Sequence, residues 1–109
     1  LLAWLRQPEV APVAAGLQLA DALGSDPQGP EMSFAREILT DWLAGELREA
    51  AMQPGARMRL ASATELWDKA HALLEEADSV NLDMKQALVV IFDAIRKHRA
   101  SSAVPIEPA

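Results

Sequence analysis

The stretch that decides the fold is SVNLDMKQALVVIFDAIRKHR, from Ser79 to Arg99, which contains six consecutive apolar residues, Ala87 to Phe92. A helix that packs against one neighbour needs only an apolar stripe about 100° wide. Six apolar residues in a row extend around the whole helix. The segment therefore predicts a helix that contacts other helices on more than one side.

Both ends of this helix carry the expected polar signals. Asn81 is the predicted N-cap, and Asp83 places negative charge near the positive end of the helix dipole. The run RKHR, Arg96 to Arg99, places positive charge near the other end. The charges therefore have the polarity that stabilises a helix between these two points.

The apolar residues of the helix divide into an inward face and two shoulders when about 100° is counted per residue. The inward face consists of Met84, Leu88, Ile91, Phe92 and Ile95. Val89 and Val90 lie off this face on either side and flank Asp93. The candidates for contact with another protein are therefore Val89, Val90, Asp93 and Lys97. The alternative is a helix at the centre of its own small bundle, in which the apolar run says nothing about partners.

Helical spacing of apolar residues recurs along the rest of the chain, and no run alternates with the period of two that a strand requires. The other predicted helices cover residues 1–6, residues 12–24, about 34 to 47, and a stretch that begins at a Ser62/Glu65 capping box. We therefore expect an all-α bundle of about five helices, spanning residues 1–100, with a disordered tail at residues 101–109. Its predicted core is centred on Trp42, Trp67, Leu73, Leu88, Ile91, Phe92 and Ile95.

Composition excludes several classes of protein. The 109 residues include no cysteine, which rules out disulfides and thiolate metal sites, and the net charge of −6 would repel nucleic acid from most of the surface. No apolar run approaches the roughly 20 residues of a membrane span, so we expect a soluble protein. The lack of cysteine suits a reducing compartment, so we expect it in the cytoplasm. The chain opens with LLAWL and no methionine, and we expect it to be a fragment of something longer.

The sequence contains no recognisable catalytic motif. His71 and His98 lie on different predicted helices, and neither has a glutamate three residues earlier, as di-metal bundles require. Gly-rich phosphate loops and the Gly-x-Ser-x-Gly turn of hydrolases are also missing. We therefore predict no catalytic, cofactor-binding or metal-ligating residue and no cofactor. An enzyme that uses His71 or His98 with nearby carboxylates is kept as an alternative.

The segment ELWDKAHALLEEADSVNLDMKQALVVIFDAI, Glu65 to Ile95, resembles the C-terminal region of the delta prime subunit of the bacterial DNA polymerase III clamp loader. The resemblance is carried by Trp67, Lys69, Asn81, Leu82, Asp83, Lys85 and Gln86, with Trp42 and Leu43 fitting the long helix upstream. This family often has arginine where Met84 stands. The difference removes one surface charge and leaves the cap unchanged.

The resemblance implies a helical collar domain that holds one subunit in a pentameric ring with the delta and gamma/tau subunits. Val89, Val90, Asp93 and Lys97 would then contact neighbouring subunits. The ATPase-like and zinc-binding elements of such subunits belong to other parts of the chain, so this region would hydrolyse no ATP and contact no DNA, membrane or small molecule. The alternative from the interaction class is an unrelated helical adaptor that docks the amphipathic helix of a partner.

Overall fold

The computed structural model describes every residue except 54, 56, 80–82 and 104–109. The described residues form five α-helices and no strand, which confirms the predicted all-α class for this part of the chain. The helices are α1 (Leu2–Arg6), α2 (Val13–Gly24), α3 (Pro30–Met52), α4 (Arg57–Ser79) and α5 (Met84–Ala103).

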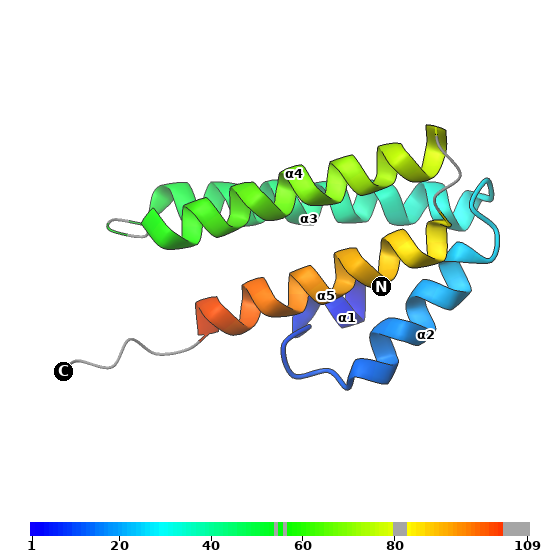
Figure 1. Ribbon diagram of the computed structural model, residues 1–109. Coiled ribbons are helices and arrows are strands. Elements are labelled where there is room, and N and C mark those ends of the chain that lie inside the picture. The colour runs from blue at the N-terminus through cyan, green and yellow to red at the C-terminus, as the bar shows by residue number, and fades with distance from the viewer. Residues whose placement is uncertain (54, 56, 80–82, 104–109) are drawn as a thin grey trace.

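The helices are arranged around α5. Figure 1 shows α3 and α4 side by side in opposite directions, with α5 below them, α2 below α5, and α1 behind α5. Helix α5 packs against both α4 and α2. It therefore has protein on two sides, which explains why apolar residues extend so far around it.

The core is centred on the inward face of α5. Leu88, Ile91 and Ile95 have no solvent-exposed surface, and Phe92 is also buried. Each such side chain contributes about 1.5 to 3 kcal/mol to the free energy of unfolding. These four residues confirm the predicted core on α5.

Three residues of the predicted core lie at its edge instead. Trp42, Trp67 and Leu73 are only partly buried and pack against the outside of the apolar cluster. The buried tryptophan is Trp4 of the short helix α1, whose ring centroid lies 5.0 Å from that of Phe92. Smaller residues of α3 and α4, such as Ala35 and Ala70, belong to the buried cluster, and the large rings of these helices pack against it.

Two helices begin earlier than the sequence predicts. Helix α3 starts at Pro30, whose missing N–H has no cost in a first turn, and not at Phe34. Helix α4 starts at Arg57, so the predicted Ser62/Glu65 capping box is wrong. Both residues lie inside α4, where the backbone N–H groups are already bonded within the helix.

The boundaries of α5 also differ from the prediction. Asp83 immediately precedes the helix, and its carboxylate accepts a hydrogen bond from the Lys85 N–H at 3.3 Å. Asp83 thus takes the N-cap position that was assigned to Asn81, which lies outside the described residues. At the other end α5 continues to Ala103, past the predicted boundary at residue 100. Residues 104–109 of the predicted tail also lie outside the described part.

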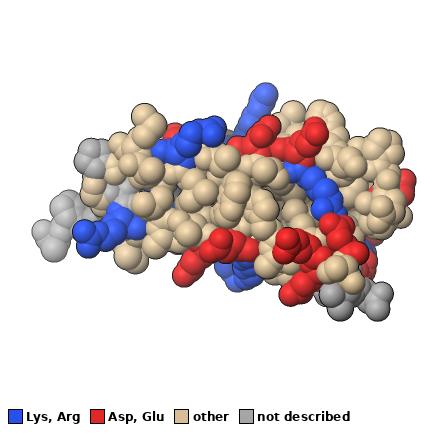
Figure 2. Space-filling model, turned by 90° about the horizontal axis from the view of Figure 1, so that it is seen from above, with Lys and Arg blue, Asp and Glu red and all other residues tan. Residues whose placement is uncertain are grey.

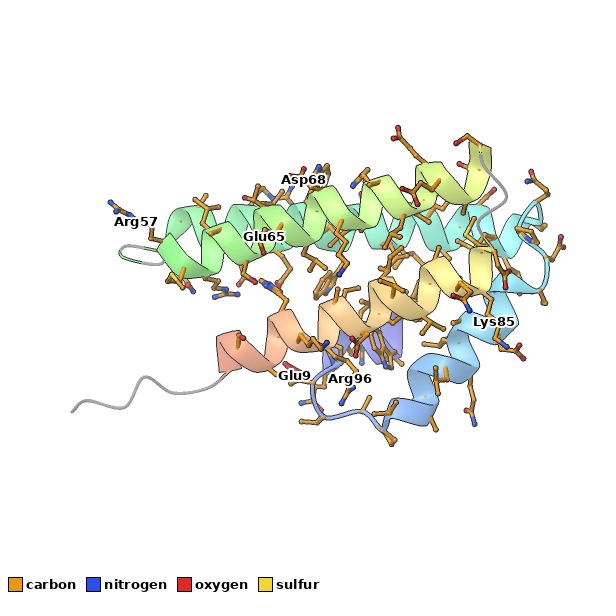
Figure 3. The ribbon with its side chains drawn as sticks, in the orientation of Figure 1. Glu9, Arg57, Glu65, Asp68, Lys85 and Arg96 are labelled. Atoms are coloured by element: carbon orange, nitrogen blue, oxygen red, sulfur yellow. The ribbon has the colours of Figure 1, made fainter. Side chains whose placement is uncertain are left out.

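Helices α2 and α5 approach each other closely at Gly24, the predicted last residue of the second helix. A Cβ atom added at Gly24 would lie 2.8 Å from the backbone N and Cα of Lys85. A salt bridge of 2.9 Å between Lys85 Nζ and Asp21 Oδ1 spans the same junction, and Figure 3 shows Lys85 beside the end of α2. The absence of a side chain at Gly24 therefore sets the spacing between these two helices.

We expect Gly24→Ala to lower the free energy of unfolding by about 1 to 3 kcal/mol, because the new methyl group would press against the α5 backbone. The matched control is Gly45→Ala in α3, where the nearest atom to an added Cβ is the Arg48 guanidinium at 3.9 Å. That change should stabilise the helix by about 0.5 to 1 kcal/mol. Chemical denaturation measures both. Equal stability of the two variants would contradict the close approach at Gly24.

Candidate functional site

Glu46 and His98 are the two polar side chains buried in the described part of the chain, each 5% exposed. His98 Nε2 lies 3.0 Å from Glu46 Oε1, and His98 Nδ1 lies 2.7 Å from Ser62 Oγ. These three residues come from α3, α5 and α4. One histidine ring therefore joins three helices at one end of the bundle.

The proton positions follow from what each group can do. An ionised carboxylate only accepts, so the His98 Nε2–H donates to Glu46. Nδ1 shares the second hydrogen bond with the Ser62 hydroxyl, which can act as donor or acceptor. Both ring nitrogens are engaged, which fixes the orientation of the imidazole.

Arg99 extends this network to the N-terminal segment. Its Nη1 lies 3.4 Å from Glu46 Oε2, and its Nε lies 3.1 Å from Glu9 Oε2. Glu9 belongs to the connection between α1 and α2. The chain of contacts thus links α3, α4, α5 and the N-terminal segment.

The pKa of Glu46 is shifted by opposing effects. Burial favours the protonated acid and raises the pKa. The hydrogen bond from His98 and the positive charge of Arg99 act in the other direction and prevail, so the pKa lies below its ordinary value of 4.5. Glu46 is therefore ionised in the folded protein at neutral pH.

Serine, histidine and a carboxylate within hydrogen-bond distance form the set that nucleophilic hydrolases use. Such enzymes also need N–H donors directed at the developing oxyanion. Ser62 lies beyond the first turn of α4, where each backbone N–H is bonded to the carbonyl four residues earlier. The described residues around Ser62 thus supply no backbone oxyanion hole, and the geometry suits a role in fixing helix positions.

The sequence contained a signal for this network that was missed. Counted along α5, His98 follows Ile91 and Ile95 on the buried face. Counted along α3, Glu46 follows Leu39 and Leu43 on the same apolar stripe. A charged or titratable residue on an apolar stripe indicates a buried polar partner, although the stripe alone does not identify it.

A groove between α2 and α5 brings the four predicted contact residues together. We call it the α2/α5 groove: its apolar floor includes Val13, Leu17, Val89 and Val90, its charged rim includes Lys69, Asp93, Arg96 and Lys97, and its volume is about 250 Å³. Val13 is 56% exposed, Leu17 is 47% exposed and Val90 is 38% exposed. The predicted residues therefore lie on one surface, to which α2 adds two apolar side chains that the sequence analysis did not select.

The four predicted residues differ in their surroundings. Val90 is exposed, whereas Val89 is half-buried and packs against the core cluster. Asp93 Oδ2 accepts from Lys97 Nζ at 3.0 Å, one helical turn away. Of the two valines, Val90 is thus the one available to a partner without disturbing the core.

A second apolar opening lies between α1 and α3. Its volume is about 680 Å³, and its lining includes Leu2, Leu5, Trp42 and Met52. Leu2 and Met52 are exposed. Unlike the α2/α5 groove, this opening includes none of the four predicted contact residues.

Charge is spread unevenly over the α3 and α4 side of the molecule. Seen from above, Asp and Glu side chains are concentrated toward the right of the view and along its lower edge, and uncharged residues fill much of the middle (Figure 2). Glu65 and Asp68 of α4 are both exposed. Within the described ranges no group of three His, Asp or Glu side chains is arranged to hold a metal ion.

Comparisons with known proteins identify no relative. The chain matches no protein-family model, no curated protein and no solved structure. In the described part of the chain, no helix has the length and apolar character needed to span a membrane. Interpretation of the two surfaces and the buried network therefore rests on the residues themselves.

We expect Glu46→Gln to lower the free energy of unfolding at neutral pH by about 1.5 to 3 kcal/mol, the usual contribution of a hydrogen bond to a charged group. A carboxyl with a lowered folded-state pKa stabilises the protein above its unfolded pKa, and this contribution is lost as the pH falls through the folded value. The difference between the wild type and Glu46→Gln should therefore shrink below pH 4.5. Urea denaturation across this pH range measures it.

The control for this experiment is Glu37→Gln, which changes an exposed carboxylate on the same helix. Its pH profile should follow that of the wild type. A stability difference for Glu46→Gln that stays constant from neutral pH to well below pH 4.5 would contradict an ionised, hydrogen-bonded Glu46.

Proposed function

We propose that this chain is an assembly module of the bacterial DNA polymerase III clamp loader, corresponding to the C-terminal collar domain of its delta prime subunit. Its task would be to hold that subunit in the pentameric ring that loads the sliding clamp. The observation that carries the proposal is the α2/α5 groove, which leaves Val13, Leu17 and Val90 exposed side by side. The groove runs along α5, the helix whose sequence resembles the delta prime subunit.

Contiguous exposed apolar residues favour a contact role. Single apolar residues on a surface need no explanation, but a group of them rimmed by charges is typical of a protein interaction site. Helix α5 anchors the bundle through Leu88, Ile91 and Ile95, and it presents Val90 to solvent. A partner bound at the groove would therefore contact a helix whose other face is buried in the core.

The partners in this proposal are the gamma/tau and delta subunits of the clamp loader, and the location is the cytoplasm. The domain itself would carry out no reaction and bind no cofactor. It would also make no direct contact with DNA, in keeping with a net charge of −6. Catalysis in the assembled complex would belong to other subunits and other domains.

The second candidate is an unrelated helical adaptor. The same observation favours it, because an apolar groove between two helices also accepts the amphipathic helix of any suitable partner. The two candidates differ in the identity of the partner. Co-purification with gamma/tau and delta separates them, since an unrelated adaptor would bind neither subunit.

We expect Val90→Asp to abolish co-purification with gamma/tau or delta. Its own stability should change by about 0.5 kcal/mol or less, because Val90 is exposed. The matched control is the next residue, Ile91→Asp, which places an unpaired carboxylate in the core and should cost several kcal/mol, enough to unfold the domain. Thermal melts and co-purification are measured on both variants.

Val89→Asp should fall between these two variants in stability, because Val89 is half-buried against the core cluster. Two results would count against the proposal. Assembly of Val90→Asp at the level of the wild type would show that the groove is not a subunit contact. Unfolding of Val90→Asp as readily as Ile91→Asp would mean that the α5 run serves only the core.

A further inference from the structure

We propose that the α2/α5 groove binds an amphipathic helix of a partner protein that carries carboxylates beside its apolar stripe. This inference names the chemistry of the partner, and it rests on the proposed function only in taking the groove as the subunit contact. Three features of the groove support it. These are the shape of the apolar floor, the excess of positive charge on the rim, and the Arg96 guanidinium, which has no ion-pair partner among the described residues.

The floor suits the side chains of a helix. Val13 and Leu17 lie one turn apart on α2, opposite Val90 on α5. Rows of residues spaced by four are the ridges that an incoming helix packs against. A volume of about 250 Å³ is also below the roughly 300 to 1,000 Å³ of small-molecule pockets. The groove is therefore suited to a few apolar side chains and not to an enclosed ligand.

The rim has more positive than negative charge, although the chain as a whole has a net charge of −6. Three cations, Lys69, Arg96 and Lys97, and one anion, Asp93, lie at the groove. Asp93 is paired with Lys97 at 3.0 Å. Among the described residues Lys69 and Arg96 form no ion pair, which leaves two positive charges for a partner to neutralise.

Arg96 is suited to bind a carboxylate of a partner. Its Nε is buried without a hydrogen-bond partner among the described residues, and Figure 3 shows the side chain extending from α5 toward the segment that leads into α2. A guanidinium presents its N–H groups in a planar fork that matches the two oxygens of a carboxylate. The buried Nε is out of reach of a bound helix, but the two terminal nitrogens of Arg96 are not among the buried atoms and have no acceptor among the described residues. A glutamate or aspartate of a bound helix would accept hydrogen bonds from these two nitrogens.

Duplex DNA is the other polyanion to consider. Its phosphates could approach Lys69 and Arg96, but the exposed Val13, Leu17 and Val90 offer nothing to a phosphate backbone. The overall negative charge of the chain would also oppose its approach. The groove therefore fits an acidic amphipathic helix better.

The probe is a synthetic helical peptide of about 18 residues, long enough to be partly helical in water, with leucines at i, i+3, i+4 and i+7 and glutamates beside them. Its matched partner has lysine in place of every glutamate. We expect the acidic peptide to bind this protein at least about tenfold more tightly in fluorescence anisotropy. The difference should shrink as salt is added, because exposed charges are screened.

Charge reversal on the protein tests where the peptide binds. Arg96→Glu and Lys69→Glu should each weaken binding of the acidic peptide by about tenfold and strengthen binding of the lysine peptide. Of the two variants, Lys69→Glu should disturb folding less, because Lys69 is exposed. The matched control is Arg57→Glu, which makes the same change in net charge at the far end of α4, where Figure 3 shows Arg57 pointing away from the bundle. Arg57→Glu should leave both affinities unchanged.

Several results would overturn the proposal. Equal affinity for the two peptides, or an effect of Arg57→Glu as large as that of Lys69→Glu, would show that the rim does not select carboxylates. Displacement of the acidic peptide by duplex DNA would make the groove a nucleic-acid surface. A dimer seen in sedimentation, lost in Val90→Asp and unaffected by either peptide, would make a second copy of this chain the occupant.

The outcomes also separate this proposal from the proposed function. If Lys69→Glu and Arg96→Glu still assemble with gamma/tau and delta, and neither peptide is preferred, the assembly role stands and the acidic partner is wrong. If the acidic peptide binds as expected but neither subunit co-purifies, the groove chemistry stands and the partner belongs to another complex.

Discussion

The fold depends on the burial of α5 between α4 and α2. Leu88, Ile91 and Ile95 lose all contact with solvent there and belong to the apolar cluster that includes residues of all five helices. Without α5, the α3 and α4 pair and the N-terminal helices would have little to pack against each other, since α2 meets α3 only at one end of the bundle (Figure 1). A single polar substitution on this face therefore threatens the whole domain.

The buried Glu46 and His98, together with the partly buried Ser62, add directional hydrogen bonds to an otherwise apolar packing. Apolar side chains tolerate small shifts of one helix along another, whereas two hydrogen bonds to one imidazole do not. Removing a single member leaves a buried nitrogen or oxygen of its neighbour without that hydrogen bond, which costs more than the bond itself contributes. The network thus favours one register of α3, α4 and α5 over its neighbours.

Local patterns were enough to predict the helices and the inward face of α5. The spacing of Leu88, Ile91 and Ile95 is set by the helix itself and needs no knowledge of the rest of the chain. The start of α4 was missed because Ser62 and Glu65 match a cap by spacing, while the helix continues back to Arg57. The pairing of Ser62 with His98 joins residues 36 positions apart, so it depends on how helices meet and no local pattern contains it. In the same way, the pattern of α5 alone predicted Val90 as a contact residue. Leu17 was not predicted, because its place in the groove depends on how α2 packs against α5.

The indole of Trp4 has a consequence for the α2/α5 groove, which it does not itself line. Its ring packs against Phe92, and a Cβ atom added at Gly16 would lie 3.7 Å from its Cζ2 atom; Gly16 and Phe92 both line the groove. The first helix therefore supports the groove from behind, and Glu9 fastens the following segment to Arg99. The depth of the groove therefore depends on the position of the N-terminal segment. A pull or a displacement applied there would reshape the surface presented to a partner while every residue in contact with that partner stayed the same.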